Sequence, residues 1–219
     1  MNNIIKVPVV LFICMAVYAC NTSRIVTAWK VPHTVQQQYD KIMVAGVYQE
    51  GNDSIRMLTE DAFVKGTEGL DYRAVPAYSE FGLKGLSGLG QAETYFKLCQ
   101  NGIDAVMTIA LIDGAKATFQ KAGDMYEYPA SHYYSRIWNY KNISASPQGT
   151  DSDTAIRFWE IILFDLNTLE ATCVLQTKSF ANNINSAVIQ EFARQAIRKL
   201  HKEKVLAKGN RDAGPLKAF

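Results

Sequence analysis

Apolar residues recur along this chain with two different periods, and the order of these periods predicts an α/β fold. Six short runs are rich in β-branched and aromatic residues or alternate between apolar and polar positions, as strands do. These runs are 24–29, 41–48, 72–78, 104–112, 155–165 and 171–180. Two of them, 41–48 and 104–112, are apolar on both faces, which is typical of strands inside a parallel sheet.

Three other segments repeat their apolar residues at helical spacing. The first begins at 52–54 and ends near Gly69, and its expected apolar face is formed by Ile55, Leu58, Ala62, Phe63 and Gly66. The second ends at Asn101-Gly102, and its expected face is formed by Ala92, Tyr95, Phe96 and Cys99. The third has the longest stripe, which is formed by Ile189, Phe192, Ala193, Ala196, Ile197 and Leu200.

The order of these elements predicts a mixed sheet. Strands and helices alternate up to residue 112, which predicts a parallel β-α-β-α-β core. The last two strands flank residues 165–170, which resemble a hairpin connection, and a C-terminal helix follows. We therefore expect a single α/β domain over residues 20–206, with an aromatic-rich insertion at about 120–154 and a flexible tail at 207–219.

Composition narrows the function classes. Of 219 residues, 48% are apolar and 20% are charged, which argues against a disordered chain and against a polytopic membrane protein. The net charge is only +2, so no broad basic field is expected to bind nucleic acid.

The first 19 residues have the form of a secretory signal peptide. Lys6 supplies one positive charge, and residues 7–18 form an apolar stretch that is short for a membrane span, which needs about 20 residues. The alternative is a core helix of the domain, and Pro8 suits a signal peptide better.

Residues Val17-Tyr18-Ala19-Cys20 resemble a bacterial lipobox, in which the cysteine becomes the acylated amino terminus. The resemblance implies removal of residues 1–19 and a membrane anchor on Cys20, to which each buried CH₂ of acyl (palmitate-type) chain contributes about 0.8 kcal/mol. Asn21 follows in place of an aspartate, which by resemblance to enterobacterial lipoproteins implies the outer membrane, facing the periplasm.

The chain as a whole resembles an uncharacterised family of envelope lipoproteins found mainly in Bacteroidetes. The segments that carry the resemblance are 27–29, 41–47, 102–107, 158–160 and 163–168. More remotely, the arrangement is similar to the amino-terminal domain of the Tol periplasmic protein and to the curli-secretion lipoprotein. These resemblances imply the fold and the envelope location, and they carry no catalytic residue.

A cluster of large aromatic residues between 126 and 140 is the strongest candidate for a binding site. Such side chains give rigid contact area with a polar handle, which suits a protein partner or a stacked sugar. The candidate binding residues are Tyr126, Tyr128, Tyr133, Tyr134, Arg136, Trp138 and Tyr140. The alternative is that this segment folds back and covers one face of the sheet.

Other chemistry-bearing residues give weaker signals. Residues 85–90 lack the Gly-Lys-Ser/Thr of a phosphate loop, and His33, His132 and His201 lack metal-ligand spacing, so we expect no cofactor and no metal. Glu160 interrupts an apolar strand face, and if that face is buried the carboxylate needs a partner such as Arg157 or a lysine.

Two cysteines remain in the mature chain, Cys99 and Cys173. They can form a disulfide in an oxidising periplasm, or each can be a small buried apolar residue. The second alternative is favoured, since both lie in apolar surroundings.

We therefore expect a lipid-anchored, non-catalytic binding or assembly component of the envelope. The alternative is a lipoprotein that binds a small ligand or glycan through residues 126–140. A hydrolase remains the third class, and it requires His132 or Glu160 to cluster with other polar groups.

Overall fold

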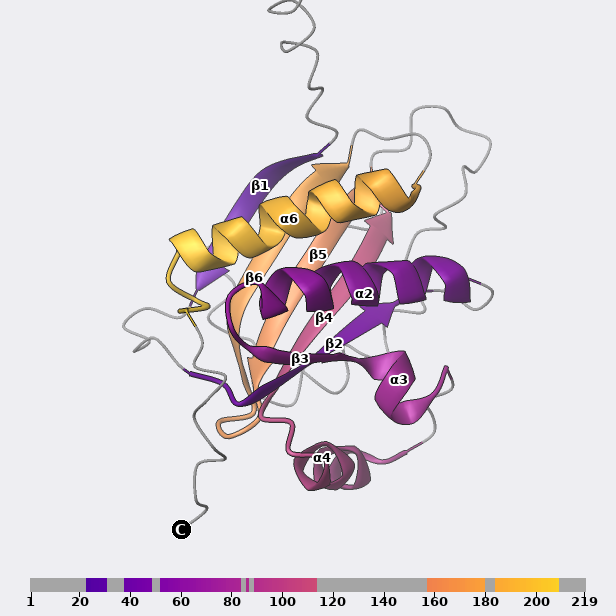
Figure 1. Ribbon diagram of the computed structural model, residues 1–219, viewed down its shortest axis with the longest axis vertical. Coiled ribbons are helices and arrows are strands. Elements are labelled where there is room, and N and C mark those ends of the chain that lie inside the picture. The colour runs from indigo at the N-terminus through magenta and orange to yellow at the C-terminus, as the bar shows by residue number, and fades with distance from the viewer. Residues whose placement is uncertain are drawn as a thin grey trace, which may run out of the picture.

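The computed structural model describes residues 23–30, 38–48, 52–83, 86, 89–113, 157–179 and 184–208. The described residues form one six-stranded sheet in the order β1-β6-β5-β4-β2-β3 (Figure 1). The strands are β1 (Ser23–Lys30), β2 (Lys41–Val47), β3 (Arg73–Pro76), β4 (Ala105–Asp113), β5 (Arg157–Asp165) and β6 (Glu170–Ser179). The helices are α2 (Asp53–Glu68), α3 (Ala77–Phe81), α4 (Gln91–Gln100) and α6 (Ser186–Lys202).

The sheet is mixed, as the sequence predicts. Strand β2 pairs in parallel with both β3 and β4, and helix α2 makes the connection from β2 to β3. Strands β4, β5, β6 and β1 pair antiparallel, with β5 and β6 forming the predicted hairpin. The parallel core, the added hairpin and the C-terminal helix are thus confirmed.

Helices α2 and α6 lie side by side across one face of the sheet (Figure 1). The indole of Trp159 stacks on the Phe192 ring at 4.7 Å between ring centroids, and Phe63 meets Phe192 edge-on at 5.3 Å. All six residues of the predicted α6 stripe are buried. Burying a large apolar side chain contributes about 1.5–3 kcal/mol, so this layer supplies much of the stability of the domain.

A second apolar cluster lies apart from this layer. Alternate residues of β5 divide between the two, since Trp159 and Ile161 belong to the α2/α6 layer and Ile162 belongs to the second cluster. Leu98 of α4 and Met43 of β2 also belong to the second cluster, and both are buried.

One expectation about local structure is wrong, and two are met only in part. Strand β3 ends at Pro76 and the chain turns at once into α3, because the Tyr78 amide donates to the Glu60 carboxylate and not to a neighbouring strand. On α4 the buried residues are Thr94 and Leu98, while Tyr95 and Phe96 are 38% and 60% exposed. This helix meets the rest of the protein along a single row, so its more apolar face lies in solvent.

Helix α2 shows the third difference. Its buried side chains are Thr59, Glu60, Phe63 and Thr67. The apolar stripe expected from the sequence is only partly buried, and Leu58 is 42% exposed. The stripe therefore extends beyond the surface that the core uses.

The predicted signal at 1–19, the insertion at 120–154 and residues 209–219 of the predicted tail lie outside the described residues. Over the ranges that the structure does describe, no helix is long and apolar enough to cross a membrane.

Candidate functional site

The residues that the sequence favours most as sites lie outside the described part of the chain. These are Cys20, Tyr126, Tyr128, Tyr133, Tyr134, Arg136, Trp138 and Tyr140. The structure does place the strand ends that flank them. Ser23 pairs with Ser179, Ser179 with Arg157, and Arg157 with Asp113. The start of β1 and both ends of the 114–156 segment are therefore attached at one edge of the sheet.

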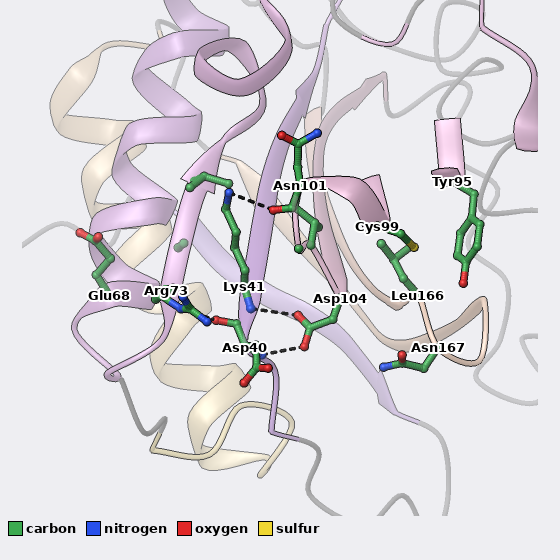
Figure 2. Close-up of a pocket in the computed structure, with 14 residues that line it drawn as sticks. Asp40, Lys41, Glu68, Arg73, Tyr95, Cys99, Asn101, Asp104, Leu166 and Asn167 are labelled. Carbon is green, nitrogen blue, oxygen red and sulfur yellow. Dashed lines mark hydrogen bonds between the residues drawn. The ribbon is translucent and has the colours of Figure 1, made fainter. Parts of the chain in front are cut away.

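A cavity of about 810 Å³ lies at the opposite edge, where β2, β3 and β4 begin. We call this the amino edge, and the edge where these three strands end the carboxyl edge. The elements that line the cavity are the starts of β2 and β3, the end of α4 with its following loop, and the β5–β6 turn (Figure 2). Its polar and reactive lining residues are Asp40, Lys41, Glu68, Arg73, Tyr95, Cys99, Asn101, Asp104 and Asn167.

Asp104 is the central polar residue of this cavity. Its Oδ2 accepts the backbone N–H of Asp40 at 2.6 Å, and its Oδ1 accepts that of Lys41 at 3.0 Å (Figure 2). Burial raises the pKa of the carboxyl above its ordinary value, although the two backbone amides act in the opposite direction. Asp104 therefore holds the first residue of β2 to the loop that starts β4.

Two cationic side chains, Lys41 and Arg73, also line the cavity. The Lys41 ammonium lies 3.3 Å from Glu80 and donates to the Asn101 carbonyl at 3.3 Å. The Arg73 Nε donates to the Asp40 carbonyl at 3.2 Å (Figure 2). The cavity rim thus combines cations with carboxylates, which suits polar ligands or a polar partner surface better than an apolar ligand.

Cys99 and Cys173 have opposite environments. Cys99 is exposed on α4 at the cavity, and Cys173 is buried in the α2/α6 layer; both are free thiols. The expectation of two buried residues is therefore wrong for Cys99, because α4 turns this face to solvent. Burial raises the pKa of the Cys173 thiol to about 12. A hydrogen bond with Cys99 raises the pKa of the Tyr95 hydroxyl.

A second polar cluster fills the carboxyl edge around Glu60, which is 0% exposed. Its Oε1 accepts the Gly46 amide at 2.9 Å and Arg56 Nε at 2.9 Å, and its Oε2 accepts the Tyr78 amide at 2.9 Å. Burial raises the pKa of this carboxyl, while Arg56 and the two amides lower it. Glu60 thus joins α2, β2 and α3, and the sequence patterns gave no signal for it.

Glu160 is buried at 1% exposure, as the strand pattern predicts if that face is inward. One of its partners is Gln176 on the next strand, whose amide nitrogen donates to it at 2.7 Å. The expected partner Arg157 has no described side chain.

Of the three histidines, His201 alone lies among the described residues. His201 is exposed, with Nδ1 lying 3.1 Å from the Leu206 carbonyl, and His33 and His132 lie outside the described residues. Among the residues that the structure describes, no three or more His, Cys, Asp or Glu side chains are grouped to hold a metal ion.

No known protein family and no curated protein matches this sequence. Among solved structures, the chain is similar to the PelC dodecamer from Paraburkholderia phytofirmans, with a TM-score of 0.42 and 8% identity over 84% of this chain and 98% of that chain. A leucine-to-methionine variant of the same PelC dodecamer gives a TM-score of 0.40 and 11% identity over 85% of this chain and 98% of that chain. Similarity at this level is weak and assigns no function.

Proposed function

We propose that this chain is a lipid-anchored protein of the bacterial envelope, in which Cys20 carries the acyl chains and the α/β domain is a non-catalytic binding or assembly component. The observation that supports this most is the lipobox-like sequence directly before the first strand. Only Asn21 and Thr22 separate Cys20 from Ser23, where β1 begins. Three extended residue steps reach about 10 Å, so the domain would sit against the membrane.

The strand register supports an orientation for the anchored domain. Ser23 lies at the edge shared by Asp113, Arg157 and Ser179. Strand β4 has 9 residues and separates that edge from Asp104 by roughly 25–30 Å, at about 3.3 Å per residue. The cavity at the amino edge would therefore face away from the bilayer, where a partner or ligand can approach it.

The roles of the Asp104 and Glu60 carboxylates support binding over catalysis. Asp104 accepts two backbone amides and Glu60 accepts two backbone amides and Arg56, so both oxygens of each are engaged in holding the fold. A general acid or base needs an oxygen within hydrogen-bond reach of its substrate. These two groups serve better as fixed supports beneath a recognition surface.

A small-ligand or glycan binder is the second candidate, and the cavity favours it. Its volume of about 810 Å³ falls in the range of about 300–1,000 Å³ that small-molecule sites occupy. Arg73 and Tyr95 in its lining are of the types that hydrogen-bond to and stack on polar ligands.

Lipidation is tested with Cys20→Ser, using Cys99→Ser as the matched control because that thiol is exposed. We expect the wild-type and Cys99→Ser proteins to incorporate an alkyne-tagged palmitate and to sediment with membranes. Cys20→Ser should do neither, and intact-mass measurement should show residues 1–19 retained. An unacylated, unprocessed wild-type chain would contradict the proposal.

The binding role is tested by cross-linking in intact cells followed by capture of the acylated protein. Replacing Tyr133, Tyr134 and Trp138 together with serine should abolish recovery of a partner that the wild type captures, with an unchanged far-UV spectrum. Undiminished recovery removes residues 126–140 from the site. A thermal-shift response to glycans or small polar ligands would favour the second candidate.

A further inference from the structure

A groove of about 770 Å³ runs between α2 and α6 on the outer side of the helix layer. Its apolar and small residues include Leu58, Ala62, Gly66 and Ile197. Three of these belong to the apolar stripe that the sequence places on α2, and of these Leu58 is exposed. The groove is separate from the cavity at the amino edge, which shares no lining residue with it.

The two helices run in the same direction, which fixes how the groove residues align. Phe63 contacts Phe192, and a Cβ added to Gly66 would lie 3.0 Å from the Ile197 side chain. Residue numbers therefore rise together along α2 and α6. Parallel helices also align their dipoles, which leaves both positive ends at one end of the groove.

Charge is divided between the two halves of the groove. Its first half carries Asp61 and Glu191, its second half carries Lys65 and Arg198, and Arg194 lies between the two halves. Asp61 accepts the Tyr78 hydroxyl at 2.8 Å, and Glu191 forms an ion pair with Arg194. Within the described part of the chain, the side chains of Lys65 and Arg198 have no ionic partner. A surface that is acidic at one end and basic at the other complements its own image after a half-turn.

We infer that this groove binds a second copy of the same chain through a twofold axis that crosses α2 and α6. Each helix then packs antiparallel on its counterpart, so the dipoles oppose. Asp61 meets Lys65 of the second copy, and Glu191 meets Arg198 of the second copy. Leu58 of one copy then lies near Leu70 of the second copy, and Leu70 also lines the groove.

The midpoints of these charge pairs agree on one axis. The α2 pair is centred on residue 63, and the α6 pair is centred between residues 194 and 195. Because Phe63 contacts Phe192, the two midpoints lie within about one helical turn of 5.4 Å. The lipid anchor takes no part in this interface.

A charge-exchange experiment tests the inference. Two differently tagged full-length copies are co-expressed, extracted in mild detergent and purified through one tag. Wild-type copies should co-purify, and co-purification should fall at least tenfold when both copies carry Glu191→Lys or both carry Arg198→Glu. A mixed pair, one copy of each variant, should recover it because both cross-subunit contacts then join opposite charges. Lys97→Glu on the exposed face of α4 is the matched control and should change nothing.

A cross-link at the axis gives a second readout that does not require a charge change. In a Cys99→Ser background, Ala62→Cys should form a disulfide-linked dimer under mild oxidation, and Ala92→Cys on α4 should not. Circular dichroism melts confirm that each variant folds. The inference is overturned if wild-type copies fail to co-purify, if the mixed pair is not rescued, or if Ala62→Cys cross-links only to a different protein.

Discussion

The two edges of the sheet hold their carboxylates in different surroundings. At the carboxyl edge Glu60 has no exposed surface and is enclosed by two backbone amides and Arg56. At the amino edge Asp104 is only partly buried and accepts two amides, with no cation bonded to it in the described structure. At the carboxyl edge the carboxylate is therefore paired with a cation and buried. At the amino edge it accepts only neutral backbone donors and lies beside the cavity.

The surrounding glycines show the same difference. A Cβ added to Gly46 would lie 2.9 Å from the Tyr48 ring, whereas one added to Gly102, which has φ +68°, would meet no atom within 4 Å. Ligands of open parallel sheets usually bind beyond the carboxyl ends of the strands. Here the described carboxyl ends of β2 and β3 are filled by the Glu60 cluster, and the cavity lies at the other edge. The comparison favours the amino edge as the described region most open to a ligand.

Removal of the Glu60 carboxylate is expected to give the largest loss of stability. Glu60→Ala leaves Arg56 without its anion and leaves the Gly46 and Tyr78 amides without their acceptor, which costs about 3–5 kcal/mol. Urea unfolding monitored by circular dichroism measures this change. The matched control is Glu93→Ala on exposed α4, which should change the unfolding free energy by less than about 0.5 kcal/mol. Equal effects of the two substitutions would contradict a closed carboxyl edge.

Substitutions on the two faces of α4, at the amino edge, test which face is buried. Leu98 is 0% exposed and Phe96 is 60% exposed. Leu98→Ala should lower the unfolding free energy by about 2–5 kcal/mol, because it leaves a cavity in the second apolar cluster. Phe96→Ala should change it by less than about 0.5 kcal/mol. If Phe96→Ala lowered the unfolding free energy more than Leu98→Ala in the same urea titration, the buried face would be the one expected from the sequence.

The fold was predictable where local periodicity reports burial. The α6 stripe faces one apolar layer, and alternate residues of β5 face two apolar clusters, so both patterns match the structure. The prediction of the buried face of α4 failed because only Thr94 and Leu98 face the protein. The larger side chains beside them lie outside that row. Periodicity shows that a helix is amphipathic, and it does not show which neighbour the helix will meet.

The described polar clusters were not predictable for a related reason. Asp104 bonds to the backbone of Lys41, 63 residues away in the chain, and Glu60 reaches the amides of Gly46 and Tyr78 at separations of 14 and 18 residues. An acceptor that holds a distant backbone amide leaves no spacing motif. The exposure of Cys99 depends in the same way on the placement of α4.

The pH dependence of stability distinguishes Asp104 as a partly open site. Asp104→Asn should lower the unfolding free energy by about 1–3 kcal/mol. The NH₂ group of the asparagine side chain would face one of the two backbone N–H donors and could not accept its hydrogen bond. Burial raises the pKa of Asp104 in the folded state above its unfolded value of about 3.9, so the contribution of the carboxyl is full below that pH and falls as pH rises through the folded pKa. The stability difference between wild type and variant should therefore be larger near pH 3.5 than near pH 7. A difference that grows with pH would contradict this sign.

Thiol labelling gives the smallest perturbation and compares the amino edge with the core. Cys99 is exposed on α4, whereas Cys173 is 2% exposed and burial raises its pKa to about 12. With iodoacetamide at pH 8, Cys99 should react in the native protein, and Cys173 should react at least about a hundredfold more slowly, since its labelling requires local opening. Peptide mass mapping reads each cysteine separately, and Cys99→Ser should leave the Cys173 rate unchanged. Equal native rates would mean that the α2/α6 layer opens as readily as the cavity edge, and the distinction between a closed core and an open edge would fail.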